Sequence, residues 1–332
     1  MKKLIAAAVA TSVSAIAFAD VSISGNANYE YFHKEDSGIN SNYADTEINV
    51  NLRGKSGDTT VVVDMEFDSH GDANTALDIE NTYLTSKIGD VNVKAGNYSS
   101  GTTALIGEID QGGRATNKVD MSTKLGSATL GYAQEFGGSA TDADGTDSAA
   151  VYAKMTIGGV NLQVKEQSDS YTAIGAAGSF NGVNYRVEQK DSDTANSDVL
   201  FYEVGTKLGD IDVSYAAIDA DQSGLVTEGD SAIFAQEMAT DADSTGKTGV
   251  DGVSQFTLGT TVDGTALKLR IGELRGATGG YKDAGFSRIE ASRALASGAK
   301  LVVSYDDYED TGVTTAAMSD TQVLEIDLSV KF

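Results

Sequence analysis

One segment of the sequence carries oxygen-bearing side chains in the order that a calcium-binding loop uses. Gly224 stands at its sixth position, and the ligand candidates at positions 1, 3, 5 and 12 are Asp219, Asp221, Ser223 and Asp230. A hard cation such as Ca²⁺ prefers carboxylate and hydroxyl oxygens. The last candidate is Asp where the pattern has Glu, and no helical pattern flanks the segment. The sequence therefore predicts either a Ca²⁺ site or a plain acidic loop, and it requires no other cofactor.

Enzymatic chemistry would need a nucleophile, a base and an orienting group. The sequence has only two histidines, His33 and His70, and Asp68 lies close to His70. This pair could form a dyad of the kind that some proteases use, but no nucleophile pattern accompanies it. We therefore expect that the protein is not an enzyme, and a hydrolase is the weakest of the alternatives.

The N-terminus has the features of an export signal. Lys2 and Lys3 precede an alanine-rich apolar run over residues 4–18, and the small residues Ala17 and Ala19 mark a cleavage site. A membrane-anchoring helix is the alternative, but the run is too short to span a hydrocarbon core of about 30 Å. We predict a secretory signal peptide at residues 1–19 and a mature chain at residues 20–332.

The composition of the mature chain limits its partners. Without Lys2 and Lys3, the 24 basic residues become 22, against 49 acidic residues, so the net charge is −27. Such a charge repels nucleic acid. The chain has no Cys and no Pro, so disulfides do not stabilise it and no proline interrupts a strand ladder.

The end of the sequence alternates strictly between apolar and polar residues. From Leu324 to Phe332 every second residue is apolar, and the residues between them are polar or charged. A period of two places all apolar side chains on one face of a β-strand. The same alternation recurs in residues 21–31, 47–53, 61–68, 160–165, 183–188, 267–271 and 301–306.

So many half-polar strands cannot close around a filled core, because the interior would be too wide to fill. A large barrel with a polar lumen and an apolar exterior solves this problem, and closure leaves no strand edge unpaired. After the signal, no run is apolar for long enough to form a transmembrane helix. We therefore predict an all-β fold, a closed antiparallel transmembrane β-barrel over residues 20–332.

Tight turns and longer polar segments alternate along the chain. The turns have hairpin chemistry and lie at residues 56–58, 89–90, 126–127, 158–159, 181–182, 209–210, 263–264 and 297–298. Eight hairpins give sixteen strands, and segments from Ala299 and from Thr321 add two more. We predict 18 strands, with 16 as the alternative, and we place the short turns on the periplasmic side and the longer loops outside.

Three features together suggest a family: the export signal, the terminal Phe332, and a strand, turn and strand over residues 77–97. With them the chain resembles the general, non-specific outer-membrane porins of Gram-negative bacteria. In that family the returning strand ends in Leu-Gly-Arg, whereas Asn97 stands at the position of the Arg here. The resemblance implies an outer-membrane homotrimer whose water-filled channels let small hydrophilic solutes and ions diffuse passively.

The resemblance also implies a constriction. Residues 98–118 would be the third outer loop, folded into the barrel, with Glu108 and Asp110 facing basic residues across the lumen. By strand parity, the basic candidates are Arg53, Lys94, Arg186, Lys268 and Arg270. Opposed charges would create a transverse field that selects solutes by size and sign. The alternative is that these side chains are only solvated lumen residues.

The acidic composition leads to a prediction of selectivity. Further acids, including Asp64, Glu66 and Asp78, share the inward parity, and acidic rings concentrate cations. We therefore expect cation preference. A non-conducting structural or adhesin barrel is the alternative, because its sequence would look much the same.

Acidic runs in the outer loops suggest further partners. They occur at residues 142–147 and 241–243, and divalent cations could bridge them to each other or to lipopolysaccharide. Outer-membrane lipid and lipopolysaccharide are therefore expected partners, together with the diffusing solutes and ions.

Overall fold

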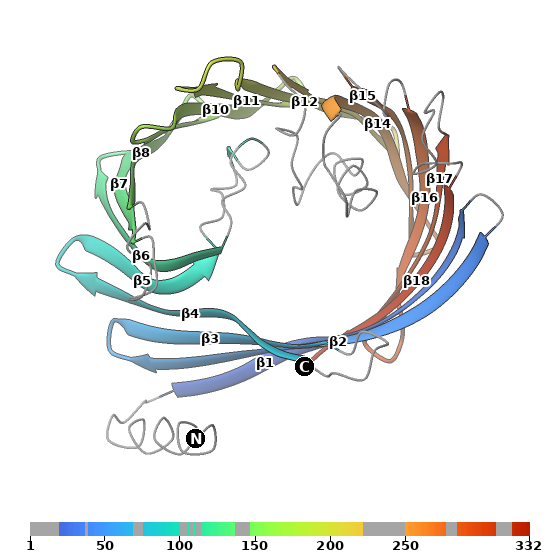
Figure 1. Ribbon diagram of the computed structural model, residues 1–332, viewed down its shortest axis with the longest axis horizontal. Helices are drawn as coiled ribbons and strands as arrows, with labels where there is room; N and C mark the ends of the chain where they lie inside the picture. The colour runs from blue at the N-terminus through green and yellow to red at the C-terminus, as the bar shows by residue number, and fades with distance from the viewer. Residues whose placement is uncertain are drawn as a thin grey trace.

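The computed structural model describes residues 20–36, 39–68, 76–99, 105–106, 109, 114–136, 147–221, 250–276, 284–309 and 321–332. These residues form one antiparallel sheet of 18 strands that closes into a barrel (Figure 1). The strands are β1 (Asp20–Asp36), β2 (Ile39–Ser56), β3 (Thr59–Asp68), β4 (Ala76–Ile88), β5 (Val91–Ser99), β6 (Arg114–Leu125), β7 (Ala128–Glu135), β8 (Ser148–Ile157), β9 (Val160–Gln167), β10 (Tyr171–Phe180), β11 (Val183–Ser192), β12 (Val199–Leu208), β13 (Ile211–Ala220), β14 (Val250–Val262), β15 (Thr265–Gly276), β16 (Ala284–Ala294), β17 (Ala299–Glu309) and β18 (Thr321–Lys331).

The barrel closes because β1 pairs with both β2 and β18. The predicted all-β barrel and the count of 18 are thereby confirmed, and the alternative of 16 is wrong. In the described part of the chain, no helix is both long enough and apolar enough to cross a membrane. The predicted signal peptide, residues 1–19, lies outside the described residues.

Eight short turns lie at one end of the barrel, and each joins an even-numbered strand to the next odd-numbered one. In the turn between β10 and β11, Asn181 and Gly182 have φ values of 50° and 81°. Two positive φ values make a type I′ hairpin, which Asn-Gly favours. One step of the predicted count is wrong, because the turn at residues 297–298 already joins the strand that begins at Ala299. The two strands beyond the eight hairpins are β1 and β18.

The outer surface of the barrel is apolar. Large side chains at alternate positions are exposed, such as Ile23, Ile174 and Ile289, whose exposed fractions are 66%, 54% and 58%. A lipid-facing band has this property. The residues between them on each strand face the lumen, and the strand register extends this assignment to neighbouring strands.

Phe332 forms two backbone hydrogen bonds where β18 meets β1. Its backbone N–H donates to the Gly25 carbonyl at 3.0 Å, and its carbonyl accepts from the Gly25 N–H at 3.0 Å. A Cβ on Gly25 would lie 2.6 Å from the Phe332 ring. The ring therefore covers the glycine, and the two residues fit each other across the closing seam.

The lumen is less uniformly polar than the alternation predicts. Phe201 of β12, Ile218 of β13 and Val253 of β14 are register neighbours with inward parity, and all three are fully buried. They form a small apolar core on the inside of the wall. The sequence signal is that apolar residues are adjacent at these strand ends, as in Leu200 beside Phe201 and Ala217 beside Ile218.

Candidate functional site

The connection between β5 and β6 lies against the inside of the barrel wall where it is described. Ile106 is fully buried, and a Cβ on Gly175 of β10 would lie 2.5 Å from its side chain. The glycine therefore provides the space that Ile106 occupies. Residues 105, 106 and 109 of this connection therefore lie on the lumen face of β10 and β11. Glu108 and Asp110 lie outside the described residues.

A buried carboxylate holds this loop to the wall. The Ile109 N–H donates to Glu188 Oε2 at 3.2 Å, and the Glu188 side chain is 0% exposed. Arg186, two residues away on β11, forms an ion pair with Glu188. The predicted constriction residue Arg186 therefore neutralises the acid that fixes the loop. Sequence reasoning missed Glu188, because inward parity does not reveal what covers a side chain.

Asn97 lies at the base of the same loop. Gly96 has φ 139° and the register between β5 and β6 shifts beside it, which is a β-bulge. Asn97 Oδ1 accepts a hydrogen bond from the Asn117 N–H at 2.7 Å. This side chain therefore joins the two ends of the loop.

Lysines and tyrosines line the lumen face from β4 to β11. Lys94 Nζ lies 4.1 Å from the ring centroid of Tyr83 and 3.8 Å from that of Tyr98, within cation–π distance. Further round the wall, Lys165 Nζ donates to the Tyr171 hydroxyl at 2.8 Å. We call this region the lysine wall; its basic residues are Lys94, Lys118, Lys154, Lys165 and Lys190.

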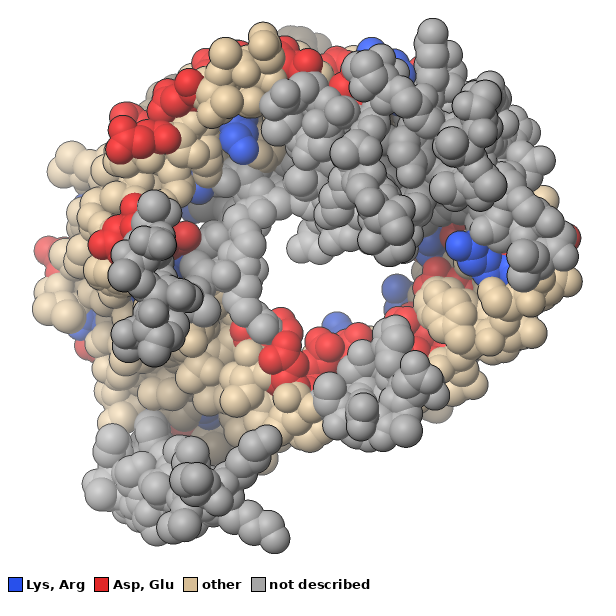
Figure 2. All heavy atoms as spheres, viewed as in Figure 1, with Lys and Arg blue, Asp and Glu red and all other residues tan. Residues whose placement is uncertain are grey.

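Carboxylates line the adjoining part of the lumen, on β18 and β1–β4. We call this region the acidic wall; its residues are Glu30, Glu47, Asp64, Glu66, Asp78, Glu325 and Asp327. Figure 2 shows acidic side chains along the edge of the opening, on the side where Figure 1 places β1–β4. Asp64 Oδ2 accepts from Asn81 Nδ2 at 3.1 Å, and its other oxygen accepts from Asn51. Neutral amides therefore orient this carboxylate without cancelling its charge.

Arginines form ion pairs with one acid on each of β16, β17 and β18. Arg270 pairs with Glu290 at 3.0 Å, and Arg288 pairs with Asp306 at 3.2 Å and with Glu325 at 3.1 Å. The predicted constriction residue Arg270 thus belongs to an ion-pair network within the wall. Arg288 therefore partly compensates the charge of the acidic wall at Glu325.

The structure does not bring the five predicted basic residues together. Arg53 and Lys94 lie on β2 and β5, Arg186 lies on β11, and Lys268 and Arg270 lie on β15. All five have inward register, but Arg53 Nε donates to Asn51 Oδ1 at 2.8 Å, and Lys268 faces its register partner Glu290. The five residues are spread around the barrel, so each contributes to the electrostatic potential of a different part of the lumen.

The predicted calcium segment is described only at its beginning. Asp219 forms an ion pair with Arg275, and Asp221 Oδ2 accepts from the Asp198 N–H at 3.4 Å. Ser223 and Asp230 lie outside the described residues, as do the acidic runs at 142–146 and 241–243. Calcium binding stays a prediction, and it would have to compete with the guanidinium at Asp219.

The described part of the chain contains one of the two histidines. His33 Nδ1 lies 2.6 Å from Asn42 Oδ1 on the outward face of β1, whereas His70 lies outside the described residues. Among the described residues, no group of three His, Asp or Glu side chains is placed to hold a metal ion.

Comparison with known proteins identifies the barrel by its fold. No family model and no curated protein sequence matches the chain. Among solved structures, Pseudomonas aeruginosa OpdL aligns with a TM-score of 0.67 and 11% identity, over 95% of this chain and 99% of OpdL. Acinetobacter baumannii OccAB2 aligns with a TM-score of 0.65 and 11% identity, over 95% of this chain and 98% of its own.

A third structure, P. aeruginosa OccK2 (OpdF) in complex with glucuronate, aligns with a TM-score of 0.62 and 13% identity, over 95% of this chain and 98% of OccK2. The fold is therefore that of outer-membrane porins. These matches do not support the narrower resemblance to general, non-specific porins, because they are to proteins of the Opd and Occ series.

Proposed function

We propose that the protein is an outer-membrane channel through which small hydrophilic solutes and ions diffuse passively, with preference for cations. The observation that carries this proposal is the opening through a closed barrel, bordered by the acidic wall (Figure 2). An apolar exterior suits lipid, and a charged lumen suits water and ions. The short turns would then face the periplasm.

Cation preference follows from how the acids are held. Asn49 donates to Glu47, and Asn51 and Asn81 donate to Asp64. An amide satisfies a carboxylate oxygen but carries no charge, so the negative potential at the opening is retained. A cation entering the lumen is attracted along this wall, and an anion is repelled.

The charge of the acidic wall also affects which organic solutes can pass. The OccK2 structure contains glucuronate, a carboxylate sugar. In this chain the carboxylates at the opening would repel such a solute, so we infer that neutral and cationic solutes pass faster. We also propose a homotrimer, on the resemblance to porins. The acidic loop sequences support the further proposal that the outer loops bind Ca²⁺ and contact lipopolysaccharide.

Single-channel recording of the mature protein in planar bilayers tests the proposal. We expect stepwise conductance and, in a KCl gradient, a reversal potential of the sign that cation preference gives. A folded barrel that conducts no current would favour the structural or adhesin alternative. Conductance with anion preference would retain the channel and refute the role given to the acidic wall.

A further inference from the structure

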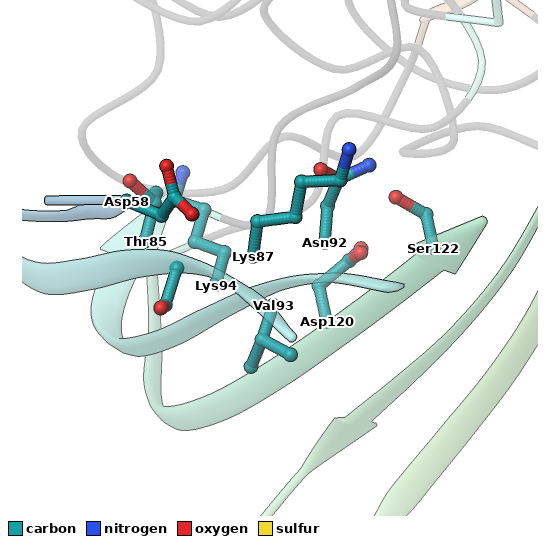
Figure 3. A pocket seen from close by; sticks show the side chains of 9 residues that line it. Asp58, Thr85, Lys87, Asn92, Val93, Lys94, Asp120 and Ser122 are labelled. Carbon is teal, nitrogen blue, oxygen red and sulfur yellow. The ribbon is translucent and has the colours of Figure 1, made fainter. Parts of the chain in front are cut away.

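A pocket of about 220 Å³ lies on the lumen side of β4, β5 and β6, near the short-turn end of the barrel (Figure 3). Its charged lining residues are Asp58, Lys87, Lys94 and Asp120, and its polar lining residues include Asn92 and Ser122. Water occupies about 30 Å³ per molecule in the liquid. The pocket can therefore hold a solute of several non-hydrogen atoms.

The strand register arranges the lining in two rows. Lys87, Asn92 and Ser122 are register partners in the row nearer the turns, and Lys94 and Asp120 face each other in the next row. Figure 3 shows these side chains on one side of the sheet, with Val93 pointing to the other side. Neighbouring rows on one face lie about 7–8 Å apart on the diagonal, so one small solute can contact both.

The side chains of the second row, Lys94 and Asp120, are held in place before any solute binds. The Lys94 ammonium lies over the rings of Tyr83 and Tyr98, and Asp120 Oδ1 accepts from the Tyr152 hydroxyl at 2.9 Å. Groups that are already ordered lose little entropy on binding. In the row nearer the turns, Lys87 and Asn92 are exposed, and Asp58 of the turn between β2 and β3 is exposed as well.

Two carboxylates and two ammonium groups line the pocket. In the described part of the chain, no ion pair joins Asp58 or Asp120 to Lys87 or Lys94. A simple anion in this space would meet two carboxylates, and a simple cation would meet two ammonium groups. Only a solute that carries both charges can satisfy both sets.

We propose that this pocket binds a small zwitterion with a carboxylate and an ammonium group, such as an α-amino acid. The carboxylate would lie between Lys87 and Lys94, and the ammonium group would donate to Asp120. Asn92 and Ser122 supply neutral hydrogen-bonding groups between them. This inference rests on the proposed function and deepens it, because it places a solute subsite at the inner mouth of the channel.

Saturation-transfer NMR on the mature protein refolded in detergent micelles tests the site. The probe is glycine, with acetate and methylammonium as solutes that carry one charge each. We expect saturable glycine binding, with midpoints for acetate and methylammonium about fivefold higher or more. Lys87→Gln and Asp120→Asn should each raise the glycine midpoint by about fivefold. Both changes keep side-chain size, and Asn at 120 still accepts from Tyr152.

Lys207→Gln is the matched control. Lys207 lies at the same end of the barrel on β12, is exposed, and pairs with Asp212 at 3.6 Å. The change removes the same charge at a distance from the pocket, so glycine binding should be unaltered. Heat-modifiable migration of each variant verifies that its barrel is folded.

Three results would overturn the site: no saturable glycine binding, equal binding of acetate and glycine, or an equal effect of Lys207→Gln. Conductance measured on the same preparations separates the two proposals. A conducting channel that does not bind glycine refutes the pocket alone. A barrel that binds glycine but conducts no current refutes the proposed channel function.

Discussion

The acidic wall and the lysine wall lie on neighbouring strands of one sheet, but their charged groups have different kinds of partner. On β1–β4, carboxylates accept hydrogen bonds from asparagine amides and border the opening. On β4–β11, ammonium groups lie over tyrosine rings, and loop residues Ile106 and Ile109 pack on the same side of the barrel. The acidic wall therefore presents its charge to the lumen, whereas tyrosine rings and loop residues partly cover the charge of the lysine wall.

This difference shows why net charge alone is a poor guide to the charge that a barrel lumen presents. The sequence carries lysines and acids at equivalent inward positions, but only exposed charge acts strongly on a passing ion. A tyrosine ring or an ion pair lowers the charge that the lumen presents. Under the proposed function, selectivity is therefore expected to follow the acidic wall. Three predictions test this comparison, and a fourth concerns a segment outside both walls.

The largest effect is expected where the loop is attached to the lysine-wall side. Glu188→Ala removes the acceptor of the Ile109 N–H and the ion-pair partner of Arg186. A hydrogen bond to a charged group contributes about 1.5–3 kcal/mol, so without it the loop should detach and the single-channel conductance should change by about twofold. Glu188→Gln is the control, because its amide oxygen still accepts from Ile109. Identical conductance in the alanine variant and the wild type would refute the anchoring role.

The next effect concerns the acidic wall itself. Glu47→Gln combined with Asp64→Asn removes two charges and keeps side-chain size. The cation-to-anion permeability ratio, measured from reversal potentials in KCl gradients, should fall about threefold. Glu166→Gln is the matched control, since Glu166 lies on the outward face of β9. An equal fall in the control would mean that overall charge, and not the wall, sets selectivity.

A smaller and opposite effect is expected from the lysine wall. Lys154→Gln combined with Lys190→Gln removes two ammonium groups that lie 5.2 Å and 4.5 Å from tyrosine ring centroids. Because the rings and the loop limit their action on the lumen, the permeability ratio should rise by less than about twofold. A change as large as that of the acidic-wall variant would remove the distinction between the walls.

The smallest effect lies outside both walls, at the predicted calcium segment. Arg275→Gln removes an exposed ion pair with Asp219, which should cost about 0.2–1 kcal/mol of stability. The change also frees the first predicted ligand, so added Ca²⁺ should raise the melting temperature of the variant more than that of the wild type. Equal response to Ca²⁺ in both proteins would argue for the plain acidic loop.

Much of the fold could be predicted from the sequence, because a barrel strand records its two environments in its own alternation. The hairpin turns, such as Asn181-Gly182, are local features, and they predict the strand count correctly, although the strand from Ala299 belongs to the eighth hairpin and β1 is the strand that the count leaves out. Inward parity also placed Arg53, Lys94, Arg186, Lys268 and Arg270 on the lumen face.

The candidate site was less predictable. Parity says which face a side chain occupies but not what lies over it, so the burial of Glu188 beneath Ile109 and the pairing of Arg186 with it could not be read from the chain. Likewise, Arg275 reaches Asp219 from a strand far along the sequence. Such partners depend on the register and on the path of the loop.

The sequence by itself determined the strands, their alternating faces, the tight turns and the strongly acidic composition, because each of these depends on neighbouring residues. Only the tertiary structure decided that the acids of β18 join those of β1–β4 across the closing seam, that the third loop rests against β10 and β11, and that Lys94 lies between two tyrosine rings. These contacts join residues that are distant along the chain, and closure of the barrel brings them together.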